Sequence, residues 1–169
     1  MTSLHGTFDA AAAFDQDISG WVTSNVRSMI HIFEGATSFD QSLGVWDLSS
    51  LSSQGLSLSV TAMSMDNFDA TLDGWAQLDP GETRVPRNIS LGAEDLIYSN
   101  VTAFDSLEID FSWAITGARY WLEDSAENDR LDGSGGAYRI VTDGLAWGPP
   151  YYRQRLFRYI ARVRREGHD

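Results

Sequence analysis

The sequence predicts an α/β fold: a short solenoid of parallel strands and short helices, then an α/β closing unit and a C-terminal amphipathic helix. Residues 8–16 return as residues 33–41 at a spacing of 25 residues, and a fixed period of this size is typical of stacked repeats. The period fades after Leu51, where other helix and strand patterns begin. Residues 151–166 combine an apolar stripe with six of the twelve arginines, which predicts the final helix.

Each repeat is expected to contain one strand and one short helix. Residues 19–23 and 43–48 follow turns and are rich in β-branched and aromatic residues, which predicts strands. Between them, Ser24 and Asn25 can cap a short helix that ends at Gly35, because its apolar positions are spaced at helical intervals. The side chains expected to form the repeat core are Phe14, Ile18, Trp21, Val26, Met29, Phe33, Phe39, Leu43, Trp46 and Leu51.

The second part of the chain predicts four further elements. They are a capped helix over residues 64–75, a strand over 88–91, a second helix capped by Ser99, and a closing strand over 113–116. We therefore expect three parts: repeat units in residues 1–62, a closing α/β unit in residues 63–118, and an extension with a Gly-rich linker, a strand and the Arg-rich helix in residues 119–169.

Residues 13–21 and 23–29 closely resemble the repeat of BspA-like leucine-rich-repeat surface proteins. Asp15 and Asp40 stand where that repeat commonly has asparagine, and residues 65–116 are similar to the unit that often closes such arrays. The resemblance covers roughly residues 8–117. It implies a leucine-rich-repeat-like solenoid and a surface protein that acts in binding or adhesion. The ligand does not follow from it, and only about two repeats are present.

The amino-acid composition excludes many catalytic mechanisms. The chain has no cysteine and no lysine, so disulfides, thiolate metal sites, a P-loop lysine and Schiff-base chemistry cannot be built. No spacing selects a pair among the twenty-four acidic residues as glycosidase carboxylates. We therefore expect no catalytic residues, no metal site, no cofactor and no enzyme activity.

The net charge of −12 comes mainly from seventeen aspartates. Repulsion among carboxylates destabilises a compact chain at low salt, and concentrated salt relieves it. Abundant Asp without Lys therefore predicts a halophilic or marine environment, while an ordinary acidic surface encoded by a high-GC genome is the alternative.

The Arg-rich helix is the expected partner-binding site. Its proposed contact residues are Tyr152, Arg153, Arg155, Arg158, Tyr159 and Arg162. It could dock on its own acidic domain, a protein partner or a second copy of the chain. Nucleic acid and anionic membrane rank lower, because the rest of the chain would repel phosphates at long range.

The function predicted from these features is non-catalytic recognition, adhesion or structural assembly on an outward-facing surface. No apolar run is long enough to span a bilayer, and the start lacks a standard secretion signal. These features favour a virion surface component of a halophile virus that contacts capsid or envelope subunits, or a cell-surface glycan or protein. A cell-envelope adhesin and a nucleic-acid-binding regulator are the alternatives. Asn88 and Asn100 lie in glycosylation sequons.

Overall fold

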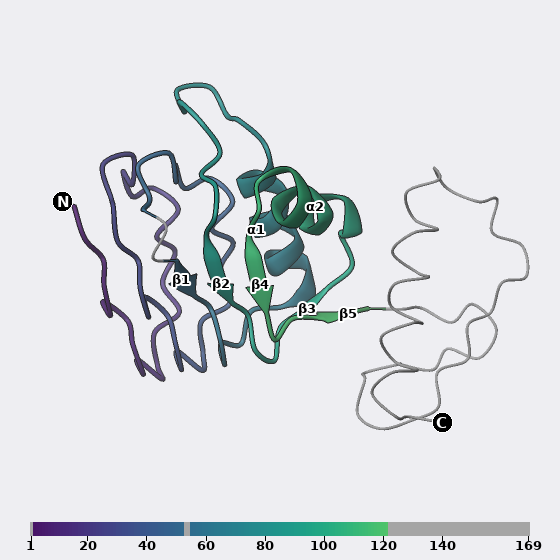
Figure 1. Ribbon diagram of the computed structural model, residues 1–169. Coiled ribbons are helices and arrows are strands. Elements are labelled where there is room, and N and C mark those ends of the chain that lie inside the picture. Colours follow the sequence, from purple (N-terminus) through teal and green to yellow (C-terminus); the bar gives the residue numbers. More distant parts are fainter. Residues whose placement is uncertain (1, 53–54, 122–169) are drawn as a thin grey trace, which may run out of the picture. The chain divides into compact units, whose positions relative to one another are not determined.

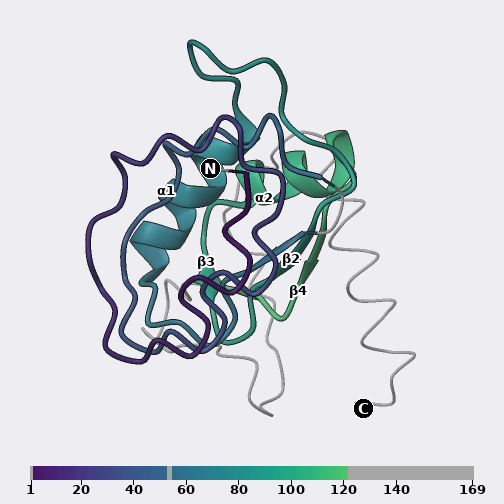
Figure 2. The same cartoon turned by 90° about the vertical axis from the view of Figure 1, so that its left-hand side faces the viewer.

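The computed structural model describes residues 2–52 and 55–121 of the chain, and these form a mixed α/β structure with parallel strands in small sheets (Figure 1). We call residues 2–27 repeat 1 and residues 28–52 repeat 2. Viewed end-on, the two repeats overlap as loops, with helix α1 (Met65–Ala76) on the side opposite strands β2 (Ser90–Gly92) and β4 (Ala114–Thr116) (Figure 2).

Backbone hydrogen bonds join repeat 1 to repeat 2 in parallel register. The N–H groups of Leu4 and Phe8 donate to the carbonyls of Ser28 and Ile32 at 2.8 and 2.9 Å. Repeat 2 donates to the following segment in the same direction. The N–H groups of Phe33 and Gly35 bond to the carbonyls of Ser57 and Ser59 at 3.3 and 3.0 Å. Each turn of the chain therefore lies beside the next.

The parallel pairing continues into a three-stranded sheet in the order β1-β2-β4, where β1 spans Leu56–Ser57. Leu56 pairs with Leu91, and Leu91 pairs with Ile115. A second pair of parallel strands joins β3 (Ile97–Tyr98) to β5 (Arg119–Tyr120). The strands predicted over residues 88–91 and 113–116 are confirmed as β2 and β4.

The helix predicted before Gly35 is wrong, as are the strands predicted over residues 19–23 and 43–48. These residues form a succession of tight turns, and residues 28–35 lie in the parallel ladder instead. The N–H of Ile32 donates to the Met29 carbonyl at 3.1 Å, and that of Trp46 to the Leu43 carbonyl at 3.0 Å. Consecutive turns of this kind place every third side chain inward, so their apolar spacing imitates that of a helix.

Aromatic rings form the centre of the core. Phe33 and Phe39 are fully buried and stack with their centroids 4.2 Å apart. Phe14 is partly buried beside them. Each fully buried side chain of this size contributes about 1.5–3 kcal/mol to the free energy of unfolding. Six other residues expected in the repeat core lie within it: Ile18, Val26, Met29, Leu43, Trp46 and Leu51.

Helix α1 confirms the capped helix predicted over residues 64–75. The Ser64 hydroxyl accepts a hydrogen bond from the Asn67 N–H, which is an N-cap interaction. Phe68, Leu72 and Trp75 point into the core. The helix therefore covers the open side of repeat 2 with an apolar face.

The second predicted helix is shorter than expected. Helix α2 spans Val101–Asp105, and a π-helical turn, η1, follows over Ser106–Asp110. Its N-cap is Asn100 rather than Ser99, because the Asn100 side chain accepts from the Ala103 N–H at 3.1 Å. The π turn buries Leu107, a position that the helical spacing also assigned to the apolar side.

Candidate functional site

In both repeats, the aspartate that follows the phenylalanine at the equivalent positions 14 and 39 holds the next turn of the chain. The Asp15 carboxylate accepts from the Asp40 N–H and the Gln41 side-chain amide, both at 2.9 Å. The Asp40 carboxylate in turn accepts from the Ser64 N–H at 2.6 Å and the Asn67 amide at 2.8 Å. The recurring Asp-Gln motif therefore forms a polar ladder whose bonds join each turn of the chain to the next.

The ladder continues at Asp69, which the 25-residue period does not reach. Its carboxylate accepts from the N–H groups of Ser99 and Asn100 at 2.9 and 3.0 Å. The sequence holds a signal for this role, because Phe68-Asp69 repeats the Phe-Asp pair after an insertion. We call Asp15, Asp40 and Asp69 the aspartate ladder.

Hydrogen bonding sets the protonation of Asp40. Partial burial acts to raise the pKa of its carboxyl, but hydrogen bonds from Ser64 and Asn67 outweigh burial and hold that pKa below its ordinary value. The group therefore stays ionised at neutral pH, the form that accepts hydrogen bonds best.

Tryptophans form a second set of contacts between successive turns. The Trp46 indole N–H donates to the Ile18 carbonyl at 3.1 Å, and the Trp75 indole N–H donates to the Leu43 carbonyl at 3.0 Å. Trp113 makes a similar bond to the Pro86 carbonyl at 2.9 Å. We call Trp46, Trp75 and Trp113 the tryptophan ladder.

Trp21 corrects one expectation about the repeat core. Its side chain is 38% exposed, although it matches Trp46 in sequence and stacks on that ring at 6.2 Å. The reason is its position in repeat 1, where no described residue covers its outer face. Phe8 lies beside it, Phe14 stacks on Phe8, and both rings are only partly buried. These three rings form the aromatic end of repeat 1.

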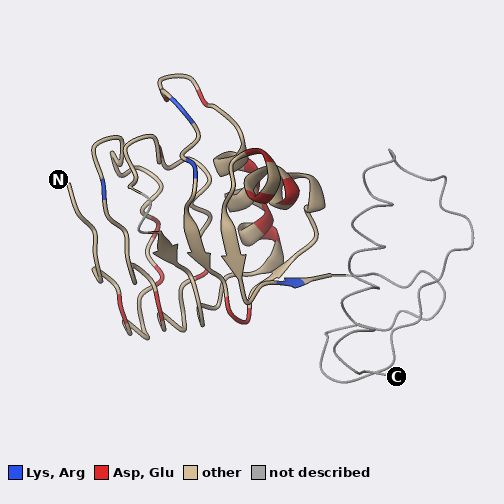
Figure 3. Cartoon of the chain, in the orientation of Figure 1, with Lys and Arg blue, Asp and Glu red and all other residues tan. Residues whose placement is uncertain are grey.

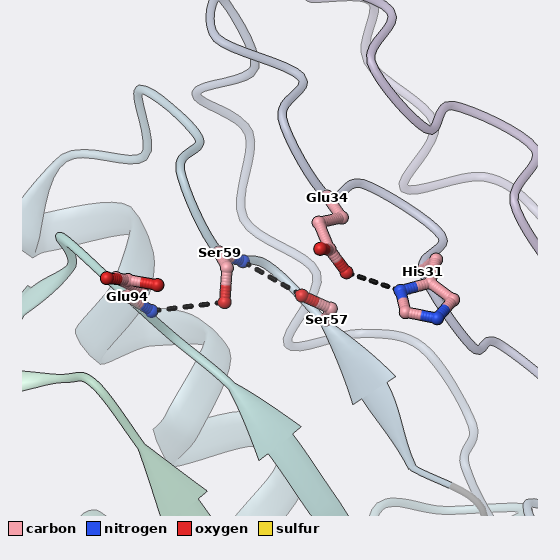
Figure 4. Close-up of polar contacts among 5 residues, drawn as sticks. All are labelled: His31, Glu34, Ser57, Ser59 and Glu94. Atoms are coloured by element: carbon pink, nitrogen blue, oxygen red, sulfur yellow. Dashed lines mark hydrogen bonds and ion pairs between the residues drawn. The ribbon is translucent and has the colours of Figure 1, made fainter.

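A polar row crosses the parallel ladder (Figure 4). His31 Nδ1 pairs with the Glu34 carboxylate, and this hydrogen bond, together with the Glu34 charge, raises the pKa of His31. Further along, the Ser59 N–H donates to the Ser57 hydroxyl, and the Glu94 N–H donates to the Ser59 hydroxyl, each at 3.2 Å. The Ser59 hydroxyl thus connects neighbouring segments, the Ser57 hydroxyl is bonded within its own segment, and His31 and Glu34 face solvent.

The surface of the described part is strongly acidic. It holds sixteen of the twenty-four acidic residues but four of the twelve arginines, so it carries the whole net charge of −12. Acidic residues lie on helices α1 and α2 and on the lower turns of the repeats (Figure 3). Such a surface attracts cationic groups and repels phosphates.

Candidate metal clusters are not found in the described ranges. Residues 2–52 and 55–121 hold no group of three or more His, Asp or Glu side chains placed to bind a metal ion. Within the same ranges, no helix is long and apolar enough to cross a membrane.

The two asparagines of the glycosylation sequons lie in different surroundings. Asn88 is exposed in a bend, whereas the Asn100 side chain serves as the cap of α2. The Arg-rich segment lies outside the described residues, with its expected contact residues Tyr152, Arg153, Arg155, Arg158, Tyr159 and Arg162.

Comparison with known proteins gives one match. A family model described as "Mycoplasma protein of unknown function, DUF285" matches residues 1–75, which contain both repeats, β1 and almost all of α1. No curated protein matches the chain. No solved structure matches it either.

Proposed function

We propose that the repeats form a short leucine-rich-repeat-like solenoid that acts as a non-catalytic recognition or assembly surface. The carrying observation is the use of the recurring motif residues. The polar groups of the aspartate and tryptophan ladders form hydrogen bonds with the neighbouring turn of the chain. The motif therefore builds a rigid scaffold, and the exposed positions between motif residues are left for contact with a partner.

The family match supports an outward-facing location. The DUF285 model is associated with BspA-like leucine-rich surface repeat proteins, which agrees with the resemblance in residues 13–29. In this proposal the protein lies on a virion surface or in a cell envelope. Its partner is a neighbouring capsid or envelope subunit, or a cell-surface glycan or protein.

The charge of the scaffold favours cationic partner groups over nucleic acid. All of the net charge of −12 lies on the described residues, so this surface repels a phosphate backbone. The same charge supports a halophilic environment, where molar salt screens the repulsion between carboxylates.

Localisation in the producing organism tests the proposal. Intact cells and purified virus particles would be treated with a protease that does not enter them, and the released peptides would be identified by mass spectrometry. Peptides from this chain are expected among the released fragments of one of the two preparations. Detection only in the soluble fraction after lysis would overturn the proposal. An abundant cytoplasmic enzyme serves as the lysis control.

A further inference from the structure

The two glycosylation sequons of the chain differ in exposure and in backbone conformation. The first covers residues 88–90 with the sequence Asn-Ile-Ser, and the second covers residues 100–102 with the sequence Asn-Val-Thr. A glycan on the Nδ2 atom of an asparagine is bulky and hydrated, so it needs space outside the fold. The surroundings of each asparagine therefore decide which sequon can carry a glycan in the folded protein.

Asn88 is exposed in the bend that precedes β2. Its backbone N–H donates to the Phe111 carbonyl at 3.0 Å, so the main chain is held at this point. Its side-chain amide forms no hydrogen bond with any described residue. Replacement of one Nδ2 hydrogen by a sugar therefore breaks no hydrogen bond of the described fold.

The backbone conformation places the two recognised residues of this sequon on the outside. Asn88 has a φ of 58°, a left-handed conformation that asparagine adopts more readily than most residues. Ile89 is 1% exposed and belongs to the core. Side chains alternate along an extended segment, and both Asn88 and Ser90 are exposed. The amide and the hydroxyl of the sequon thus lie outside the core, with the buried Ile89 between them.

Asn100 lies in different surroundings, because its side chain is part of the fold. It is partly buried, and its Oδ1 atom accepts from the Ala103 N–H at 3.1 Å as the N-cap of α2. Its own N–H donates to the Asp69 carboxylate of α1 at 3.0 Å. Residues 101–102 lie in the first turn of α2. A glycan on Asn100 would therefore crowd the cap and the contact between α1 and α2.

We propose that Asn88 is an N-glycosylation site and that a lipid-phosphate-linked oligosaccharide is the glycan donor. The Asn88 Nδ2 atom forms a bond to the anomeric carbon of the sugar and loses one proton to a base of the transferase. The bond between that carbon and the phosphate oxygen breaks, and the lipid phosphate leaves. Ser90 supplies the hydroxyl that completes the acceptor sequence. The inference rests on the proposed outward-facing location, because this transfer takes place outside the cytoplasm.

Burial of Ile89 sets the order of transfer and folding. A transferase has to hold residues 88–90 in its own site, but in the folded chain Ile89 is in the core and Ser90 pairs with Ala114 of β4. Transfer therefore precedes the pairing of β2 with β4. Once the sheet has formed, the exposed position of Asn88 leaves the glycan in solvent.

The protein isolated from the producing organism is the test sample. Cleavage after glutamate releases residues 83–94 and residues 95–108 as separate peptides, so the two sequons are measured independently. Fragmentation mass spectrometry is expected to find a sugar on Asn88 and to find the peptide that contains Asn100 unmodified. Modification of Asn100 alone, or of both asparagines to the same extent, would contradict the selection by exposure and conformation.

Two variants at one position test whether the modification depends on the sequon. Ser90→Ala removes the hydroxyl but keeps Asn88, and is expected to abolish the glycan. Ser90→Thr restores a hydroxyl and is expected to retain it. The Ser90 hydroxyl forms no hydrogen bond with any described residue, so both variants should fold, which circular dichroism verifies. The same sugar on Asn88 in Ser90→Ala, or its loss in both variants, would overturn the inference.

The location of the protein separates failure of this inference from failure of the proposed function. An unmodified peptide of residues 83–94 from protein recovered at the cell or virion surface would refute the glycosylation site and leave the proposed function standing. Recovery of the chain only from the soluble cell interior, with both peptides unmodified, would refute the function and the site together.

Discussion

At the residue scale, the recurring polar side chains act as connectors between turns of the chain. Asp40 illustrates the role, because one carboxylate oxygen accepts both the Ser64 N–H and the Asn67 amide. Thr71 of α1 also connects two turns of the chain. Its hydroxyl accepts from the buried Leu43 N–H at 3.0 Å and donates to the Asn67 carbonyl at 2.7 Å. Burying that N–H without an acceptor would cost about 1–3 kcal/mol.

Asp40 makes the stability of the fold depend on pH. The pKa of its carboxyl is below the ordinary value of 3.8 in the folded chain, so its contribution is present above that ordinary value and is lost as the pH falls through the folded pKa. Thermal unfolding between about pH 6 and about pH 2 should therefore lose less stability in Asp40→Asn than in the wild type.

The control for this experiment is Asp73→Asn. Asp73 lies on the exposed side of α1, and its removal should leave the pH dependence close to that of the wild type. An unchanged slope in Asp40→Asn would show that the carboxylate contributes no pH-dependent stability.

At the element scale, the approach of α1 to repeat 2 depends on two glycines. A Cβ atom at Gly74 would lie 2.2 Å from the Gly44 carbonyl oxygen, and one at Gly44 would lie 2.4 Å from the Ala70 carbonyl oxygen. The added Cβ atoms would collide with backbone carbonyl oxygens, so no side-chain rotation would relieve the clash. The helix can lie against repeat 2 only because both positions lack side chains.

Gly74→Ala is therefore expected to destabilise the protein. In a helix interior, alanine is more stabilising than glycine by about 1 kcal/mol. Overpacking at this contact should cost more, so the free energy of unfolding should fall by about 1–3 kcal/mol. Denaturant unfolding measures the change. Asp73→Ala, on the exposed side of the same helix, is the control and should be neutral or stabilising. A stabilised Gly74→Ala protein would show that α1 does not pack this closely.

At the scale of the whole molecule, the described residues form one scaffold with a large excess of negative charge. Parallel bonding runs from repeat 1 through repeat 2, β1 and β2 to β4, so one continuous hydrogen-bonded framework carries the carboxylates. Their mutual repulsion acts against this compact state and weakens when salt shortens the Debye length from about 10 Å at 0.1 M to about 3 Å at 1 M.

The temperature of unfolding should therefore rise as sodium chloride increases from about 0.1 M to about 1 M. Circular dichroism during heating measures it. Sucrose at matched osmolarity is the control for effects that do not depend on charge. Stability that does not respond to salt would contradict both the repulsion and the halophilic interpretation.

How far the sequence predicts the structure depends on the kind of signal. The 25-residue period and the apolar residues within it indicate stacked turns and most of the core, because burial demands apolar side chains at fixed intervals. The caps and spacing of residues 64–75 predict α1 well. The sequence does not predict that the Trp21 side chain is exposed, because its match to Trp46 does not indicate which of the two rings other residues cover.

The sequence by itself determined the repeat length, the identity of the motif residues and the excess of acidic charge. Only the tertiary structure decided that the motif segments are tight turns and ladder strands rather than helices, because consecutive tight turns and helices both place apolar residues about three apart and the spacing alone does not distinguish them. Only the tertiary structure also showed that Asp15, Asp40 and Asp69 bond to the following turn. Those partners lie 24 to 31 residues away, a distance that no local propensity encodes.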